Sequence, residues 1–220
     1  MDLIKFSYLY NYEFQREYHS KISLKTFQQG EYILKAGDEI DGFYFLINGK
    51  YYVSSLEITG KELLLRYCRV PAILGDIEVF EGCTIQSNCI AAEPCEFIFV
   101  PYHLYESTLR HDSQFTPLLL KELAYKLRTC TISSRVNALS PASVRLAAYL
   151  CTIESTSLFK DYIMTNTLDE VATLIGTTKR HLNRIVKQWI DEGIARRNEE
   201  QIEILDWEQV KQISDNVRFE

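Results

Sequence analysis

The sequence predicts an α+β protein, in which an N-terminal antiparallel β-roll or jelly roll precedes a long helix and a C-terminal winged helix-turn-helix. Three observations lead to this prediction. Seven of the nine glycines lie between residues 22 and 107, among short β-prone runs. Residues 115–139 form one long helical pattern without glycine. From residue 142 onward the pattern is mainly helical and contains no proline.

The composition is that of an ordinary globular protein. The 220 residues have a mass of 25.6 kDa and are 46% hydrophobic and 25% charged, which excludes disordered, collagen-like and membrane-spanning classes and favours two domains. The first residues lack the layout of a signal peptide, so we expect a cytoplasmic protein. None of the six cysteines forms a Cys-x-x-Cys pair, and we expect most to be reduced and buried. The net charge of −6 still allows a local basic patch.

The region from residue 22 to about 107 predicts short strands joined by turns. The first four β-prone runs begin about 8 to 12 residues apart, a spacing typical of all-β folds. They are Tyr32–Leu34, Phe43–Ile47, Tyr51–Val53, Leu63–Tyr67 and Glu96–Val100. Asn48-Gly49 is typical of a hairpin turn, and Thr59-Gly60 is a weaker turn signal. These features predict an antiparallel barrel or jelly roll.

Residues 115–139 are predicted to form one helix, with Pro117 in its first turn and Ser140-Pro141 ending it. One side carries residues at alternating spacings of three and four, the pattern of a coiled-coil seam. These residues are Leu120, Leu123, Leu127, Cys130 and Ser134. Periodicity alone leaves two interpretations open, because the same stripe suits packing on the protein's own barrel and pairing with a second copy.

The C-terminal part predicts three helices and a hairpin. The helices are 144–153, 168–175 and 178–190, and the hairpin strands are 194–197 and 201–205, which turn through residues 198–200. Thr167 and Glu170 have the spacing of a capping box. Gly176 is expected to take the left-handed conformation that ends the middle helix, and Thr177 or Thr178 to cap the next one. This order is a helix-turn-helix with a hairpin wing.

The last of the three helices has one apolar and one basic face. Its apolar residues recur at i, i+3, i+4 and i+7 and are predicted to be buried. They are Leu182, Ile185, Val186 and Trp189. Residues 171–190 contain four basic residues and no acidic one. Because a helix fits the major groove, where Arg and Lys donate to guanine and Asn pairs with adenine, this face predicts DNA binding.

The candidate DNA-binding residues divide into base readers and phosphate contacts. Lys179, Arg180 and Arg184 are the candidate base readers, because residues near the start of such a helix reach deepest into the groove. The full set is Thr177, Thr178, Lys179, Arg180, His181, Asn183, Arg184 and Lys187, with Thr177, Thr178 and His181 expected at phosphates. The alternative is a solvated basic face on an ordinary helical hairpin.

Four stretches together carry a resemblance to a known family. Residues 27–38 and 44–50 are similar to the opening strands of a cyclic-nucleotide-binding domain. Residues 74–80, Leu-Gly-Asp-Ile-Glu-Val-Phe, are similar to its phosphate-binding cassette, and residues 176–185 to a recognition helix. In this order the chain resembles the Crp/Fnr family of bacterial transcription regulators from about residue 24 onward. Within the family, the cassette and the run Arg180-His181-Leu182 are similar to YeiL-type regulators.

The resemblance implies a homodimeric transcription regulator with three parts. These are a cyclic-nucleotide-binding-like β-roll sensor domain (1–111), a dimerisation helix and hinge (112–140), and a winged helix-turn-helix DNA-binding domain (141–220). Two recognition helices would meet successive major grooves of a near-palindromic operator, and RNA polymerase is the further partner expected of an activator. A family position that is often acidic is Arg180 here, so the operator is expected to differ from that of the cAMP receptor protein.

The family also implies an effector pocket. It would comprise Gly75, Asp76, Ile77, Glu78, Gln86, Ser87, Cys130 and Thr131. Asp76 suits a ribose hydroxyl, but Gln86 stands where an arginine would hold a cyclic phosphate, and Glu78 replaces a small residue. An Arg–phosphate contact near 4 Å is worth about 4 kcal/mol at an effective dielectric of about 20, so we expect no cAMP binding.

Further expectations concern two helix residues of this pocket, its ligand and possible cofactors. Cys130 and Thr131 match adenine-facing positions, although dimer packing is the favoured role for both. Another ligand in the roll and a vestigial sensor are both open alternatives. Residues 1–67 contain no cysteine, so the iron-sulfur cluster of Fnr-like members is not expected, and neither is any other cofactor. A redox pair among Cys83, Cys89 and Cys95 is a less favoured alternative.

Two other classes of function compete with this prediction. A jelly roll can be a cupin-like metal-binding enzyme, but His19, His103, His111 and His181 lack ligand spacing, and catalytic motifs are absent. We therefore expect a protein that is not an enzyme and has no metal site. The C-terminal domain is alternatively a protein-interaction module, since ten basic and thirteen acidic residues after Pro141 give it a net charge of −3.

Overall fold

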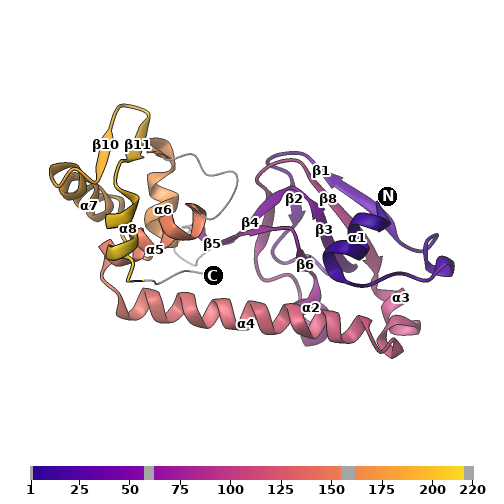
Figure 1. The fold of residues 1–220 in the computed structure, drawn as a ribbon. Helices are drawn as coiled ribbons and strands as arrows, with labels where there is room; N and C mark the ends of the chain where they lie inside the picture. The colour runs from indigo at the N-terminus through magenta and orange to yellow at the C-terminus, as the bar shows by residue number, and fades with distance from the viewer. Residues whose placement is uncertain (1, 57–61, 155–161, 216–220) are drawn as a thin grey trace. The chain divides into compact units, whose positions relative to one another are not determined.

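The computed structural model describes residues 2–56, 62–154 and 162–215 and has the predicted α+β class. The chain divides into two compact units, residues 1–126 and 127–220. Strands dominate the first unit and helices the second (Figure 1). The long helix α4 (Phe115–Leu139) has the predicted bounds and runs from the first unit into the second. The role of residues 112–140 as a dimerisation helix and hinge stays a prediction.

Two four-stranded antiparallel sheets form the N-terminal unit. One has the strand order β1-β8-β3-β6 and the other β2-β7-β4-β5. The first consists of β1 (Ser23–Phe27), β8 (Cys95–Pro101), β3 (Gly42–Asn48) and β6 (Ala72–Leu74). The second consists of β2 (Tyr32–Leu34), β7 (Asn88–Ala91), β4 (Lys50–Leu56) and β5 (Glu62–Arg69). The β-prone runs did not predict β1, which is largely exposed, or the short strands β6 and β7.

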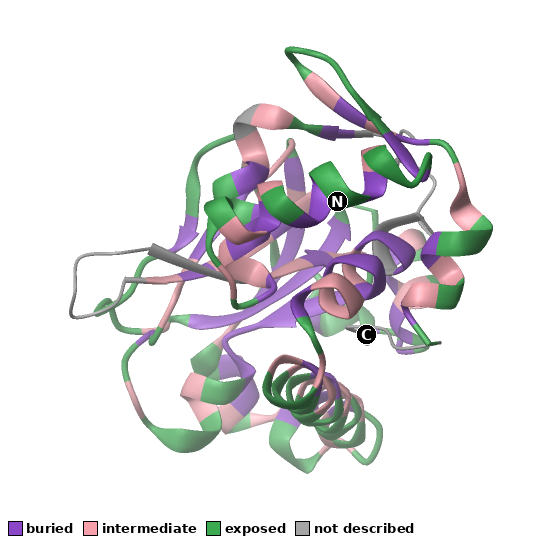
Figure 2. Cartoon of the chain, turned by 90° about the vertical axis from the view of Figure 1, so that its left-hand side faces the viewer, coloured by how far each residue is buried: buried purple, intermediate pink, exposed green. Residues whose placement is uncertain are grey.

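Strand β3 is buried on both faces, and this explains why its sequence does not alternate. Phe43, Phe45 and Ile47 belong to a core that includes residues of the surrounding helices, whereas Tyr44 and Leu46 belong to the core between the two sheets. In Figure 2 many residues of the strands are purple, the colour of buried residues. Since side chains alternate across a strand, apolar residues at every position require cover on both sides.

The first helix, α1 (Leu3–Tyr10), was not predicted, and it covers the outer face of β3. Its N-cap is Asp2, whose carboxylate accepts a hydrogen bond from the Lys5 N–H. Phe6 and Tyr10, one turn apart, are buried and pack edge-on against Phe45. The Tyr10 hydroxyl also lies 2.7 Å from the Leu46 carbonyl oxygen on β3. The helix forms because its aromatic stripe meets the roll, a long-range contact that local patterning does not reveal.

The prediction of a hairpin at Asn48-Gly49 was wrong. The strands on either side, β3 and β4, belong to different sheets, so the turn is a corner where the chain passes from one sheet to the other. Gly49 has a φ of 90°, and a Cβ there would lie 2.3 Å from the Pro94 carbonyl oxygen. The glycine is therefore required by close packing as well as by its backbone conformation. The weaker signal joins β4 and β5, which do pair, but Thr59-Gly60 lies outside the described residues.

Helix α4 begins at an aspartate cap and packs on the roll through its first turns. The Asp112 carboxylate accepts hydrogen bonds from the N–H groups of Gln114 at 2.8 Å and Phe115 at 3.1 Å. Phe115 and Leu119 are fully buried in the core beside β3. The interpretation of α4 as a helix that packs on its own barrel therefore applies to these two residues.

The predicted seam of α4 uses other residues and is mostly uncovered. Leu120 is 56% and Leu127 70% exposed. Cys130 and Ser134 are also exposed, and Leu123 is half-buried. Exposed leucines on one side of a long helix are typical of a surface that meets a partner. Pairing of the seam with a second copy stays a prediction.

The C-terminal unit is a helical domain with a small sheet. Its helices are α5 (Ala142–Glu154), α6 (Leu168–Leu174), α7 (Lys179–Asp191) and α8 (Trp207–Ile213). Its antiparallel sheet has the order β10 (Ala195–Arg197), β11 (Gln201–Ile204), β9 (Tyr162–Met164). The predicted hairpin wing is confirmed as β10–β11, whereas β9 and α8 were not predicted. No helix in the described ranges is long and apolar enough to cross a membrane.

Candidate DNA-binding surface and effector pocket

The turn between α6 and α7 has the predicted geometry. Gly176 takes a φ of 62°, and the Thr177 N–H returns to the Ala172 carbonyl oxygen at 2.8 Å. Thr178 is the N-cap of α7, because its hydroxyl accepts a hydrogen bond from the His181 N–H at 3.2 Å. A glycine C-cap followed closely by a threonine N-cap turns the chain sharply between two helices. The predicted helix-turn-helix is therefore present.

The predicted capping box at the start of α6 is wrong. A 3-10 turn (Thr165–Thr167) precedes the helix, and Thr167 has a φ of −96° and a ψ of 4° in place of the extended conformation of a usual N-cap. The Thr167 hydroxyl instead donates to the Met164 carbonyl oxygen at 2.9 Å. Threonine side chains commonly bond backward in this way where the backbone is already turning.

Helix α7 separates its apolar and basic residues as predicted. The four residues of the apolar stripe, from Leu182 to Trp189, are at most 5% exposed. They join the core of the C-terminal unit with residues of α5, α6 and the wing. The four basic side chains of the opposite face are exposed, and these are Lys179, Arg180, Arg184 and Lys187. The fold therefore holds one positively charged helix face toward solvent in an acidic protein.

The candidate DNA-binding side chains make several contacts with one another and with neighbouring elements. Lys179 Nζ lies 2.5 Å from an Asp169 carboxylate oxygen on α6, and both side chains of this ion pair are exposed. Arg184 Nη2 lies 3.1 Å from His181 Nε2. Because a guanidinium can only donate, the ring nitrogen of His181 is the acceptor here.

The wing adds two cations that the sequence prediction missed. Arg196 pairs with Glu203 across the hairpin at 2.6 Å, and Arg197 donates to Asn183 of α7, also at 2.6 Å. The signal was present in the sequence, since two arginines end the predicted strand 194–197 directly after the basic helix. Only the tertiary fold shows that one of them reaches α7.

The helix cap provides a first test of this geometry. Thr178→Ala should lower the free energy of unfolding of the C-terminal unit by about 0.5 to 2 kcal/mol, because the His181 N–H loses its acceptor. Both tryptophans, Trp189 and Trp207, lie in this unit, so urea unfolding followed by tryptophan fluorescence measures the change. Thr177→Ala is the matched control. Equal losses in both variants would contradict the cap assignment.

The cassette in the N-terminal unit holds a buried carboxylate at the start of α2 (Asp76–Glu81). Asp76 is 1% exposed, and its Oδ1 lies 2.5 Å from Nζ of Lys126 on α4. Lys126 Nζ also donates to the Ile73 carbonyl oxygen at 2.8 Å. Asp76 Oδ2 is buried and has no hydrogen-bond partner in the structure. The acid that was predicted to meet a ligand hydroxyl is thus paired with a lysine of the protein itself.

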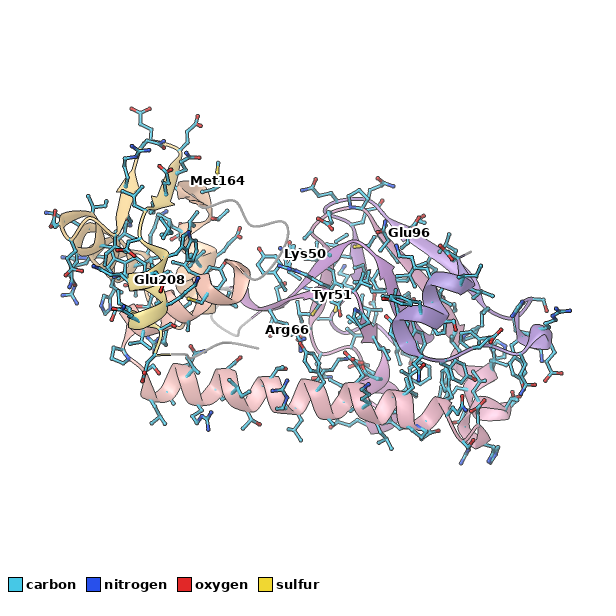
Figure 3. All side chains as sticks on the ribbon, viewed as in Figure 1. Lys50, Tyr51, Arg66, Glu96, Met164 and Glu208 are labelled. Atoms are coloured by element: carbon cyan, nitrogen blue, oxygen red, sulfur yellow. The ribbon has the colours of Figure 1, made fainter. Side chains whose placement is uncertain are left out.

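The surroundings of this ion pair are rich in carboxylates. Burial raises the pKa of the Glu78 and Glu122 carboxyl groups. Arg66 of β5 lies near Tyr51 of β4, as Figure 3 shows, and its charge acts on Glu122 as well. Three acidic groups face two cations in this region, so an added anion finds no surplus of positive charge.

The remaining pocket candidates differ in their exposure and in their hydrogen bonds. Gln86 is exposed, and its amide nitrogen donates to the Thr84 carbonyl oxygen at 2.7 Å. Ile77 is 43% exposed and Ser87 half-buried, whereas Gly75 caps α2 with a φ of 88°. Cys130 and Thr131 lie in the C-terminal unit and are exposed, and the Thr131 hydroxyl donates to the Leu127 carbonyl oxygen. Lys126 was missed, because nothing local links it to Asp76.

Candidate metal ligands in the described part of the chain are His, Cys, Asp and Glu side chains, and the cysteines are also candidates for thiol chemistry. No group of three or more His, Cys, Asp or Glu side chains there could hold a metal ion. Four of the six cysteines are buried, as expected. Burial raises the pKa of the Cys89 thiol and raises that of Cys95 to about 11. A thiol with so high a pKa is protonated near neutral pH and reacts slowly.

Comparison with known domains assigns both units. The cyclic nucleotide-binding domain matches residues 24–112, and the Crp-like helix-turn-helix domain matches residues 144–213. The protein is thus of the class that joins a cyclic-nucleotide-binding-type β-roll to a helix-turn-helix. Because both domains occur in this order and together span more than half of the sequence, the chain belongs to the Crp/Fnr family of transcriptional regulators.

Individual relatives are distant but extensive. Regulatory protein YeiL of Escherichia coli O157:H7 is 23% identical over 164 residues, which are 74% of this chain and 73% of the relative. The cAMP-activated global transcriptional regulator CRP of Haemophilus influenzae is 22% identical over 167 residues, 74% of this chain and 75% of the relative. A solved CRP/FNR-family transcriptional regulator from Thermus thermophilus has the same fold, with a TM-score of 0.75 at 21% identity over 89% of this chain and 100% of that one.

Proposed function

We propose that this protein is a homodimeric, sequence-specific DNA-binding transcription regulator that acts in the cytoplasm and is not an enzyme. The observation that carries the proposal is the exposed basic face of α7, held by a capped turn and a hairpin wing inside the matched helix-turn-helix domain. We call α7 the recognition helix from here on. The absence of acidic residues between 171 and 190 leaves the segment positively charged, as binding to the phosphates of DNA requires.

The proposed contacts follow from the position of each side chain. Arg180, Arg184 and Lys179 are proposed to donate to base edges. Lys179 would leave its ion pair with Asp169 when the protein binds DNA. Thr177, Thr178 and His181 at the start of the helix and Lys187 further along it are proposed to contact phosphates. Each protomer would present one such surface to one half of a near-palindromic operator, and RNA polymerase would be contacted if the protein activates transcription.

The proposed dimer uses the exposed seam of α4. Leu120 and Leu127 are the large apolar side chains that this helix leaves open to solvent before its last residue, Leu139. Leucines at spacings of three and four pair readily with the same stripe on a second helix. Dimerisation would cover them and set the distance between two recognition helices.

The effector is proposed not to be cAMP, although three relatives carry names that describe them as activated by it. The cyclic phosphate needs a charge-assisted donor, but Gln86 is uncharged and bonded to its own loop. The cassette acid Asp76 is already paired with Lys126, and Glu78 adds a further carboxylate. A ligand of another class, or no ligand, fits this cassette better.

The test begins with selection of duplexes from a random pool by the purified full chain. On the selected operator, Arg180→Ala and Arg184→Ala should each weaken binding by about 1 to 3 kcal/mol and relax the preference at one base position. Arg16→Ala, which removes an exposed arginine from the N-terminal unit, is the control and should leave affinity unchanged. Failure to enrich any duplex would contradict the proposed function, and unchanged base preference in both variants would contradict the assigned readers.

A further inference from the structure

Asn183 of the recognition helix is hydrogen-bonded at both ends of its amide. Its Nδ2 donates to the Lys179 carbonyl oxygen at 3.0 Å, and its Oδ1 accepts from Nη1 of Arg197 at 2.6 Å. Strand β10, which carries Arg197, lies beside α7 (Figure 1). Since a guanidinium has only donors, this contact fixes which end of the amide is the oxygen. The Asn183 side chain thus links the recognition helix to the wing.

This arrangement conflicts with a role in base reading. An asparagine that reads adenine uses both ends of its amide, with the oxygen accepting from N6 and the nitrogen donating to N7. In Asn183 the oxygen already accepts a hydrogen bond from a charged donor, a class of bond about twice as strong as a neutral one. Adenine would have to displace Arg197 from this position.

The two wing arginines have different electrostatic surroundings. Neighbouring residues of a strand point to opposite faces, and Arg196 lies opposite Glu203, with which it forms an ion pair. Arg197 lies opposite Ile202. None of the ion pairs among the described residues includes Arg197. Within the part of the chain that the structure describes, its charge is therefore uncompensated, and most of its N–H donors remain for another acceptor.

We propose that Asn183 is a positioning residue that holds the Arg197 guanidinium for a backbone phosphate of DNA and does not itself read a base. The proposal rests on the proposed DNA-binding function and assigns the wing a part in it. Phosphate contacts fix the orientation of a protein on the duplex. The Asn183–Arg197 contact would therefore set how the recognition helix and the wing engage DNA together.

A double-mutant cycle on the selected operator tests this assignment. Arg197→Ala is expected to weaken binding about tenfold on all selected sequences and to lower the salt slope by about 1 for each arginine removed. Asn183→Ala is expected to weaken binding about threefold, with the base preference of the wild type at every position. In the Arg197→Ala background it should have no further effect, because residues that act through one contact are not additive.

Arg196→Ala is the matched control, since it removes the same residue type from the same strand. The loss of binding free energy in Arg196→Ala should add to the loss in Asn183→Ala when the two substitutions are combined. Urea midpoints from tryptophan fluorescence show whether each variant remains folded. Relaxed preference at an A·T pair in Asn183→Ala, or full additivity of Asn183→Ala with Arg197→Ala, would overturn the assignment while DNA binding stands. If the wild type selects no duplex, the proposed function itself fails, and this assignment with it.

Discussion

Replacing Lys126 by Met is expected to lower the free energy of unfolding of the N-terminal unit by about 3 to 5 kcal/mol. The substitution leaves the Asp76 carboxylate, which is 1% exposed, without the ammonium group that now lies 2.5 Å away. The Ile73 carbonyl oxygen loses its Lys126 donor at the same time. A buried charge without its partner costs far more than an exposed one, and this explains the size of the expected loss.

The measurement should separate the two units. Both tryptophans lie in the C-terminal unit, so tryptophan fluorescence reports that unit and should change little. Twelve of the fourteen tyrosines lie in the N-terminal unit, so the tyrosine band of the near-UV circular dichroism spectrum reports the roll. Lys121→Met on the exposed side of the same helix is the control and should cost within about 0.5 kcal/mol. Asp76→Asn combined with Lys126→Met should be less damaging than Lys126→Met alone. A loss no larger than that of Lys121→Met would show that the ion pair does not hold the cassette.

Raising the salt concentration from 50 to 200 mM is expected to weaken binding to the selected operator by about 10³-fold or more. Each cation that neutralises a phosphate releases condensed counterions, and six to ten such contacts give losses of about 10³ to 10⁵ over this range. Two protomers would present eight basic side chains from their recognition helices, before the wing arginines are added. The affinity would be measured by fluorescence anisotropy of a labelled duplex at a series of salt concentrations.

A duplex of scrambled sequence is the control for this experiment. Its affinity should fall with a similar or smaller slope from a weaker starting value, because phosphate contacts do not depend on sequence. Affinity that hardly changes with salt would contradict the proposed use of the basic face. The same series on Arg184→Ala shows whether that residue contributes to the slope or only to base preference.

Much of the fold follows from local signals in the sequence. The bounds of α4 were predicted because Pro117 in the first turn and Ser140-Pro141 at the end frame an uninterrupted helical pattern. The apolar stripe of α7 and the left-handed Gly176 were predicted because helical periodicity and turn chemistry act within a few residues. Helix α1, the short strands and the corner at Gly49 were missed or misjudged, since each depends on a partner distant in the chain.

The same division applies to the candidate site. The sequence by itself determined a basic helix after a tight turn, and this helix is the basis for the proposed class of partner, since charge and periodicity are properties of neighbouring residues. Only the tertiary structure decided that Lys126 neutralises Asp76 fifty residues away and that Arg197 reaches Asn183. Hydrogen bonds and ion pairs between separate elements depend on where the folded backbone places each side chain, to within an ångström or so, about the tolerance that their geometry allows.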